Sequence, residues 1–123
     1  MNSVDLYLKF RAEIDKICVP EVLKCLETIP IIEKGEQTGL FCVAHMTYWE
    51  YIDCLYILPE YRRKGAGRAV ALEFYKENKG REIRLHIIHT NTVAQQFWRS
   101  IFDLEEIESN DVDGLYRIRG LNK

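Results

Sequence analysis

Residues 61–70 combine concentrated positive charge with glycine directly before a predicted helix. The segment reads YRRKGAGRAV, and its cations and glycines are Arg62, Arg63, Lys64, Gly65, Gly67 and Arg68. Backbone N–H groups at the start of a helix have no partner within it, and the helix dipole adds partial positive charge there. Glycine lets a ligand come close to the backbone. The segment therefore predicts an anion site suited to a phosphate or pyrophosphate group.

Outside this segment the chain is acidic. It contains 17 Lys and Arg against 19 Asp and Glu, which gives a net charge of −2. Four of the bases belong to the glycine segment, so 13 bases face 19 acids elsewhere. One basic segment is too small a footprint for nucleic acid, and we expect no nucleic-acid partner.

Three known phosphate-binding loops can be compared with the segment. A Walker loop needs Lys followed by Ser or Thr after its last glycine, where this chain has Arg68 and Ala69. A Rossmann loop needs Gly or Ala where Val70 stands, and its glycines directly follow a strand. The third pattern, R/Q-x-x-G-x-G/A, is satisfied at every defined position by residues 62–67.

The third pattern is the acyl-CoA pyrophosphate loop of the GNAT family of N-acetyltransferases, which this sequence resembles in two blocks. The first block, IDCLYILPEYRRKGAGRAV at residues 52–70, looks like the family's fourth strand, loop and third helix. The second block, NTVAQQFW at residues 91–98, is similar to the family's N-x-x-A-x-x-F-Y. With the elements between them, the blocks cover about residues 31–108. The resemblance implies transfer of an acetyl group from acetyl-CoA to an amine.

The resemblance also implies where acetyl-CoA binds. The pantetheine arm would lie along the fourth strand, the pyrophosphate on N–H groups of the loop, and Asn91 would reach the cofactor from the later helix. The implied residues are Leu55, Tyr56, Ile57, Arg62, Arg63, Lys64, Gly65, Ala66, Gly67, Arg68, Asn91 and Trp98. Two of them have a second interpretation, because Asn91 can be a plain helix N-cap and Trp98 a core aromatic residue.

In the family a neutral amine attacks the thioester directly, and a backbone N–H, here near Ile57, polarises the carbonyl. The ammonium form must first lose a proton, commonly to a carboxylate or through water. Asp53 and Glu50 are the two acids that could serve. Asp53 is favoured because in a regular strand it shares a face with Leu55 and Ile57, although a β-bulge would reverse this argument. The alternative that neither Asp53 nor Glu50 acts as the base stays open.

The sequence departs from the family where the usual general acid is a tyrosine, because Trp98 stands there. An indole N–H delivers no proton at neutral pH, so the CoA thiolate would leave unprotonated or take a proton from water. Cys54 is interpreted as a buried structural thiol rather than an acyl carrier. His86 and His89 are three residues apart on a strand and point to opposite faces, so neither is interpreted as a base or ligand. Two alternatives to the enzyme follow: a non-catalytic CoA-binding or regulatory module, and a pure interaction protein.

An acidic run precedes the C-terminal strand, with no Lys or Arg among its acids. Its members are Asp103, Glu105, Glu106, Glu108, Asp111 and Asp113. As a rim of the acceptor pocket it would attract a cationic amine, on a small molecule or on a protein lysine. A solvated acidic face is the other interpretation.

The elements that must position these residues follow from periodicity, caps and prolines. We expect helices at 2–17, 20–29, 65–78 and 91–101, a hairpin of 31–33 and 40–47 that turns through Gly35 and Gly39, and strands at 51–58, 83–89, 104–108 and 115–119. This order predicts one α/β (α+β) domain over residues 1–123, with a mostly antiparallel sheet flanked by helices. By the resemblance, the fourth strand is splayed to hold acyl-CoA and the N-terminal part is short.

Length and cysteine usage set the remaining expectations. A chain of 123 residues suits one domain. It has no membrane-length apolar run and no signal-peptide pattern at residues 1–10, so we expect a cytoplasmic protein without a membrane partner. The four cysteines, Cys18, Cys25, Cys42 and Cys54, show no metal-ligand spacing and are expected to be free buried thiols, with no metal. Exchange of a strand or hairpin into a homodimer is left open.

Overall fold

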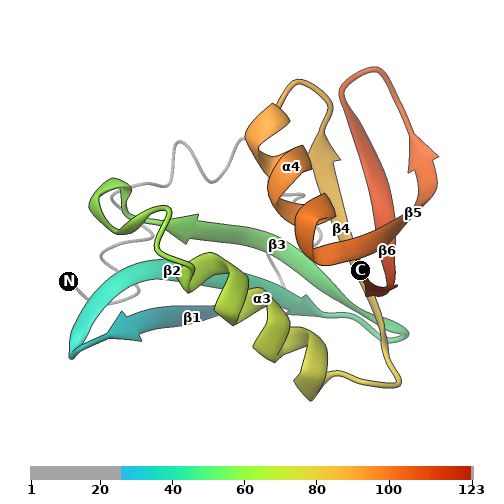
Figure 1. The fold of residues 1–123 in the computed structure, drawn as a ribbon. Helices are drawn as coiled ribbons and strands as arrows, with labels where there is room; N and C mark the ends of the chain where they lie inside the picture. The colour runs from blue at the N-terminus through green and yellow to red at the C-terminus, as the bar shows by residue number, and fades with distance from the viewer. Residues whose placement is uncertain (1–25, 123) are drawn as a thin grey trace.

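The computed structural model describes residues 26–122, which form a six-stranded sheet and two α-helices (Figure 1). In chain order the elements are β1 Leu26–Glu33, β2 Glu36–His45, β3 Trp49–Ile57, the 3-10 turn η1 Pro59–Tyr61, α3 Ala66–Glu77, β4 Glu82–Ile88, α4 Thr92–Ile101, β5 Phe102–Ser109 and β6 Asp113–Leu121. The strand order is β1-β2-β3-β4-β6-β5. Only β3 and β4 pair in parallel, so the mostly antiparallel sheet predicted from the sequence is confirmed.

The first strand corrects one of the predicted helices. The helix expected at 20–29 is wrong from Leu26 onward, where β1 begins, and its earlier part lies outside the described residues, like the helix expected at 2–17. Pro30, which we predicted to follow the end of a helix, lies inside β1 opposite Leu40 of β2. This is tolerated because β1 is an edge strand of the sheet that residues 26–122 form, where the missing N–H of proline removes no necessary ladder bond.

The first hairpin turns more tightly than expected. Its turn is Lys34 and Gly35, which have φ of 50° and 80°, as a two-residue type I′ turn requires. Gly39, which we predicted in the turn, lies within β2. A Cβ atom at Gly39 would sit 2.3 Å from the backbone oxygen of Tyr56. Gly39 is therefore explained by the close approach of two strands rather than by a turn.

The sheet divides between β3 and β4. These strands pair only over Trp49–Ile52 and Glu82–Leu85. Beyond that point β3 stays with β2 as far as Ile57, while β4 continues beside β6 (Figure 1). The splayed strand expected from the resemblance is therefore β3.

Both helices pack on the same face of the sheet. The buried cluster beneath them is Ile31, Phe41, Val43, Ile52, Ala71, Phe74, Ile83, Leu85, Ile87, Trp98, Ile101, Phe102 and Tyr116. Phe41 of β2 meets Phe74 of α3 edge to face, with the ring centroids 5.2 Å apart. Among the described residues, no helix is both long and apolar enough to cross a membrane.

The first prediction concerns this core. Phe41→Ala should lower the free energy of unfolding by about 3–5 kcal/mol, because it removes a fully buried ring and leaves a cavity beside Phe74. Urea unfolding followed by circular dichroism measures the loss. Val112→Ala is the control, since Val112 is 63% exposed and its truncation should change stability by less than about 0.5 kcal/mol. Equal effects of the two substitutions would contradict the packing described.

Candidate functional site

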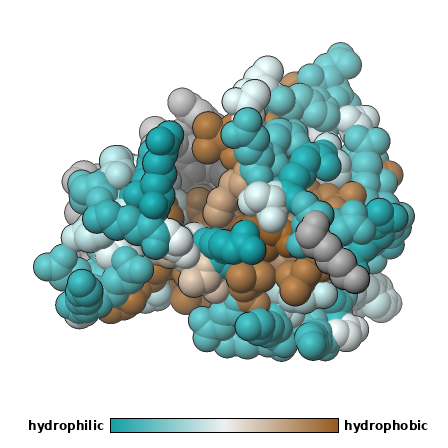
Figure 2. Space-filling model, viewed as in Figure 1, coloured by the Kyte–Doolittle hydropathy of each residue, from teal (hydrophilic) through white to brown (hydrophobic). Residues whose placement is uncertain are grey.

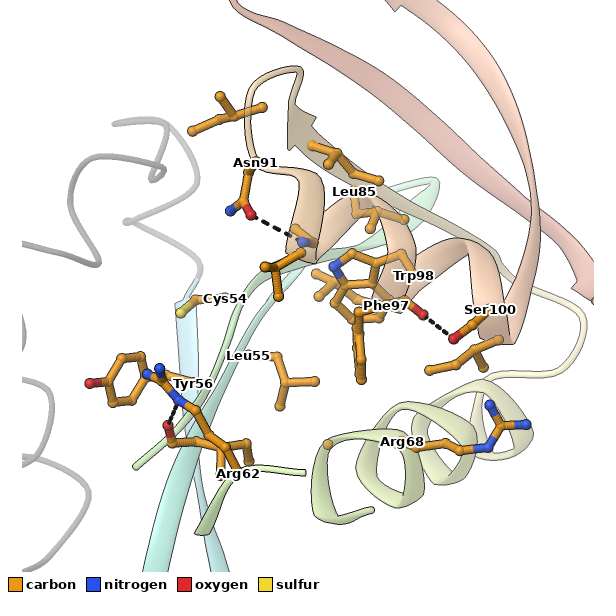
Figure 3. A pocket seen from close by; sticks show the side chains of 18 of the residues that line it. Cys54, Leu55, Tyr56, Arg62, Arg68, Leu85, Asn91, Phe97, Trp98 and Ser100 are labelled. Carbon is orange, nitrogen blue, oxygen red and sulfur yellow. Dashed lines mark hydrogen bonds between the residues drawn. The ribbon is translucent and has the colours of Figure 1, made fainter. Parts of the chain in front are cut away.

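A cavity of about 1030 Å³ lies where β3 and β4 part. It is lined by residues 52–57 of β3, 85–88 of β4, parts of the segment 61–68, parts of α4 and the turn at 112–113. Figure 3 shows Leu55 and Phe97 pointing into the space between β3, α3 and α4. On the surface, apolar residues gather between α3 and α4 with hydrophilic side chains around them (Figure 2). The splayed strand and the glycine segment thus meet at one site.

The glycine segment forms the start of α3. Gly65 is the N-cap residue in the left-handed region, with φ of 85°, and the first backbone bond runs from Ala69 N–H to Gly65 O at 3.0 Å. N–H groups before Ala69 therefore have no carbonyl to bind within the helix. A Cβ atom at Gly67 would sit 3.4 Å from the Phe97 ring and 3.6 Å from Leu55, which both line the cavity. A larger side chain at position 67 would therefore enter the cavity.

The cations of the segment take different positions. Arg62 donates from Nε to the backbone oxygen of Ile57 at 2.8 Å, and its guanidinium lies 5.3 Å from the centroid of the Tyr56 ring (Figure 3). Arg62, Arg63 and Arg68 all line the cavity. Lys64 is not among the lining residues, and its ammonium lies 5.9 Å from the centroid of the Tyr61 ring. Three of the four cations thus surround the start of α3 on the cavity side.

Asn91 and Trp98 fit both of their interpretations. Asn91 Oδ1 accepts a hydrogen bond from Ala94 N–H at 3.0 Å, so it is the N-cap of α4, and it also lines the cavity. Trp98 is 8% exposed and stacks on Phe102, with centroids 6.3 Å apart. It is therefore a core aromatic residue, and it lines the cavity as well.

The two candidate acids have different surroundings. The register of β2 and β3 shifts where Cys42 faces Cys54 and Val43 faces Ile52, so Asp53 is the extra residue of a β-bulge. The bulge puts Ile52 on the core face that Leu55 also occupies, so the strict alternation from which Asp53 was expected to share the face of Leu55 does not hold. Asp53 is nevertheless a lining residue, buried to 7% exposure.

Glu50 is not among the lining residues. Its carboxylate accepts from Arg81 Nε at 3.1 Å and lies 2.6 Å from Nδ1 of His45. Arg81 also donates to the backbone oxygen of Met46 at 3.0 Å. Glu50 therefore ties the turn between β2 and β3 to the start of β4, away from the cavity.

This cluster makes stability depend on pH. Burial lowers the pKa of His45, but hydrogen bonds to the carboxylates of Glu50 and Glu27 and their charges outweigh it, so the pKa is raised above 6.5. The folded protein then holds this proton more tightly than the unfolded chain. The stabilisation is complete below about pH 6.5 and is lost as pH rises through the folded pKa. Because the His45 side chain is 51% exposed, this stabilisation is below about 1 kcal/mol.

We therefore expect wild type to lose more stability than His45→Gln when the pH rises from 5.5 to 8. The glutamine keeps a polar side chain but has no proton to gain or lose. Urea unfolding of both proteins at the two pH values measures the difference. Identical losses would show that His45 is not linked to folding.

The cysteines agree with the sequence where they are described. Cys42 and Cys54 are free and buried, and Cys18 and Cys25 lie outside the described residues. Burial raises the pKa of Cys42 to about 11, opposed by a hydrogen bond with Thr28 and assisted by the charge of Asp53. Cys42 is thus protonated at neutral pH. Within residues 26–122, no group of three or more His, Cys, Asp or Glu could hold a metal ion.

The acidic run is partly neutralised by arginines of β6. Arg119 pairs with Asp103 at 3.1 Å, and Arg117 pairs with Glu105 at 3.2 Å. Asp113 lines the cavity. The run therefore carries less net charge than its sequence suggests, and its role as an acceptor rim stays a prediction.

Among the lining residues that were not predicted from the sequence, three bear on the chemistry of the site. His86 of β4 lines the cavity although we interpreted it as neither base nor ligand. Val93 and Val112 also line it while being 76% and 63% exposed, so they form an apolar edge of the opening. The sequence holds no signal for His86, because only the parallel pairing of β3 and β4 sets it level with Asp53, the residue after Ile52. No pattern in the sequence pointed to the valines.

Known proteins resemble this chain in sequence pattern and in fold. The sequence profile of the Acetyltransferase (GNAT) family matches residues 25–103. The PaiA N-acetyltransferase of Thermoplasma acidophilum, solved in complex with coenzyme A, is 23% identical with a TM-score of 0.64, covering 76% of this chain and 60% of that one. A GNAT family acetyltransferase of Elizabethkingia anophelis, solved with acetyl-CoA bound, is 14% identical with a TM-score of 0.63, covering 92% and 86%.

A third solved structure, the ribosomal-protein-S18-alanine N-acetyltransferase of Escherichia coli, is 13% identical with a TM-score of 0.63, covering 96% of this chain and 89% of that one. The chain spans 60% of the Thermoplasma protein and 66% of a Thermus thermophilus acetyltransferase. At these identities the likeness concerns the fold. A comparison with curated proteins gives no match.

Proposed function

Because the chain belongs to the GNAT family of acetyltransferases, we propose that it is an N-acetyltransferase that moves the acetyl group of acetyl-CoA to a primary amine. The observation that carries the proposal is one cavity that joins the start of α3 to the gap between β3 and β4. One end offers free N–H groups and arginines for a pyrophosphate, and the other offers an extended strand for the pantetheine arm.

The cavity residues fit acetyl-CoA by charge and by shape. N–H groups of residues 66–68 and the side chains of Arg62, Arg63 and Arg68 are assigned to the pyrophosphate, while Lys64 contributes charge from outside the lining. Residues 55–57, Asn91 and Trp98 are assigned to the pantetheine arm. The absence of a side chain at Gly67 keeps the cavity open between Leu55 and Phe97.

The same residues support direct transfer. When bound, acetyl-CoA supplies an activated acyl group whose thioester carbon accepts the amine. A backbone N–H near Ile57 would receive the negative charge that develops on the carbonyl oxygen. Asp53 is the carboxylate that we assign to the acceptor's ammonium group, as its counter-charge and as a candidate for its proton, because it lines the cavity and Glu50 does not.

The acceptor is proposed to be a cationic amine, on a small molecule or on a protein. Asp53 and Asp113 both line the cavity, so their charges would draw an ammonium group inward. The exposed edge formed by Val93 and Val112 gives an apolar group beside the amine a surface to contact.

A non-catalytic CoA-binding module is the second candidate, and Trp98 is the observation that favours it. The indole stands where the family has a proton-donating tyrosine, and it packs into the core. Such a module would bind acetyl-CoA equally well but would transfer no acetyl group.

Two measurements on the wild-type chain test the proposal. Calorimetric titration with acetyl-CoA should give micromolar binding. Release of free CoA thiol in the presence of spermidine, kanamycin and a lysine-containing peptide should then identify an acceptor. Binding without release by any amine would favour the CoA-binding module. A well-folded protein that does not bind acetyl-CoA would exclude both and leave an interaction protein.

A further inference from the structure

His86 lies at the point where β3 and β4 part. The parallel ladder ends with Ile52 opposite Leu85, so Asp53 and His86 are the next residues on the two strands. Both line the cavity. The fold therefore places a carboxylate and an imidazole on adjacent strands where the gap opens, although the two residues are 33 positions apart in the chain.

Tyr51 holds His86 from the sheet face opposite the helices. Leu85 and Ile87 belong to the core beneath α3 and α4, so His86 between them is on the other face of β4. Tyr51 is 4% exposed and is not among the lining residues. Its Oη lies 2.5 Å from Nδ1 of His86, and the two ring centroids are 5.6 Å apart. The hydrogen bond occupies Nδ1 and leaves Nε2 as the ring nitrogen that can meet a ligand.

We propose that His86 accepts the proton of the acceptor's ammonium group at Nε2, while Tyr51 holds the imidazole through Nδ1. The inference rests on the N-acetyltransferase function proposed above. It requires the tautomer in which Nδ1–H donates to Tyr51 Oη, because only this form keeps a lone pair on Nε2. Tyr51 is thus a positioning residue, and Asp53 is the counter-charge for the ammonium group and then for the imidazolium.

The protons and electrons of this step balance. An N–H bond of the ammonium group breaks and the proton forms a bond to Nε2. The electron pair left on the amine forms the C–N bond to the acetyl carbon, and the C–S electron pair leaves with sulfur. The second amine proton goes to the thiolate, and His86 returns its own proton to solvent.

Two carboxylates share the cavity with His86. Asp53 on β3 and Asp113 on β6 line the same cavity, while Leu115 of β6 is paired with His86 in the ladder. The nearby arginines are engaged elsewhere. Arg84 lies over the Trp49 ring, 3.8 Å from its centroid, and bonds to Glu82, and Arg117 bonds to Glu82 and Glu105.

The tautomer of His86 is tested by nitrogen-15 NMR on the full chain, with the resonance assigned from its loss in His86→Gln. In the neutral ring, Nδ1 should carry the proton and Nε2 should be free. Tyr51→Phe should shift the ring toward the Nε2–H form, a change that a merely packed histidine would not show. Acetyl-CoA at saturation should move the His86 resonances, and His86→Gln should bind acetyl-CoA within about threefold of wild type, since it is not in the anion site. A protonated Nε2 in the wild type would overturn the proposal.

The second readout is the pH profile of transfer to the amine that the wild type acetylates. His86→Gln should lower kcat/KM by about a hundredfold at pH 7, and the deficit should shrink as the pH approaches the pKa of the amine, because a neutral amine needs no base. An equal deficit at every pH would mean a structural role and would overturn the inference. Failure of the wild type to bind acetyl-CoA would overturn the proposed function, whereas binding with Nε2 protonated would overturn this inference alone.

Discussion

Replacement of Gly65 and Gly67 by glutamate is expected to abolish acetyl-CoA binding, with Kd rising more than a hundredfold. Position 67 faces Phe97 and Leu55 across the cavity, so the new side chain would occupy the assigned pyrophosphate site with a negative charge. The variant loses two charge-assisted hydrogen bonds to the pyrophosphate and adds charge repulsion. Together these weaken the binding free energy by at least about 3 kcal/mol, which corresponds to a rise in Kd of more than a hundredfold. Calorimetric titration measures it.

The variant should stay folded, because carboxylates near a helix N-terminus interact favourably with its dipole. Gly65 has φ of 85°, so a side chain there costs about 1–2 kcal/mol of stability. Gly67→Glu alone avoids that strain and should weaken binding nearly as much. Gly120→Glu is the matched control, since position 120 has no atom within 4 Å of its Cβ and is not among the lining residues. Equal binding by Gly67→Glu and Gly120→Glu would refute the assigned phosphate site.

The second large effect separates the two candidate acids. Asp53→Asn should lower kcat/KM for the amine by about a hundredfold while acetyl-CoA binding is unchanged, because it removes the carboxylate from the cavity without changing its size. Glu50→Gln should leave kcat/KM within about threefold. It should instead lower the free energy of unfolding by about 1 kcal/mol, since the buried Glu50 side chain loses its charge while its partner Arg81 is 41% exposed.

Steady-state kinetics with the identified amine, acetyl-CoA titration and urea unfolding on both variants give the comparison. The reverse outcome, with activity lost in Glu50→Gln and retained in Asp53→Asn, would move the chemistry to the turn between β2 and β3. A fall in stability for Asp53→Asn with activity unchanged would make Asp53 a structural residue of the bulge.

The family assignment leaves open how the reaction works without the usual tyrosine. Trp98 can contribute contact area but no proton at neutral pH. In the step proposed above, a histidine held by Tyr51 takes the proton from the amine, and a thiolate needs little help to leave. Trp98 in place of the tyrosine is therefore compatible with catalysis when His86 of β4 takes the proton of the amine.

The sequence by itself determined the features that depend on neighbours a few residues away. The cation-glycine segment at the start of α3, the cap made by Asn91 and the helix that carries Trp98 were all predicted, because helix starts and faces follow from spacings of three and four residues. The strands expected at 51–58, 83–89, 104–108 and 115–119 likewise match β3, β4, β5 and β6 to within a few residues.

Tertiary structure alone decided what depends on strand order and register. Pro30 indicates a helix end in the sequence, but β1, which contains it, is an edge strand among the described strands. The one-residue bulge at Asp53 reverses which side chains face the helices, and no local pattern encodes it. The contact of Tyr51 with His86 and the pairing of Asp103 with Arg119 join residues 35 and 16 positions apart. Such contacts are fixed when strands pair, so only the assembled sheet shows which charges are neutralised and which groups line the cavity.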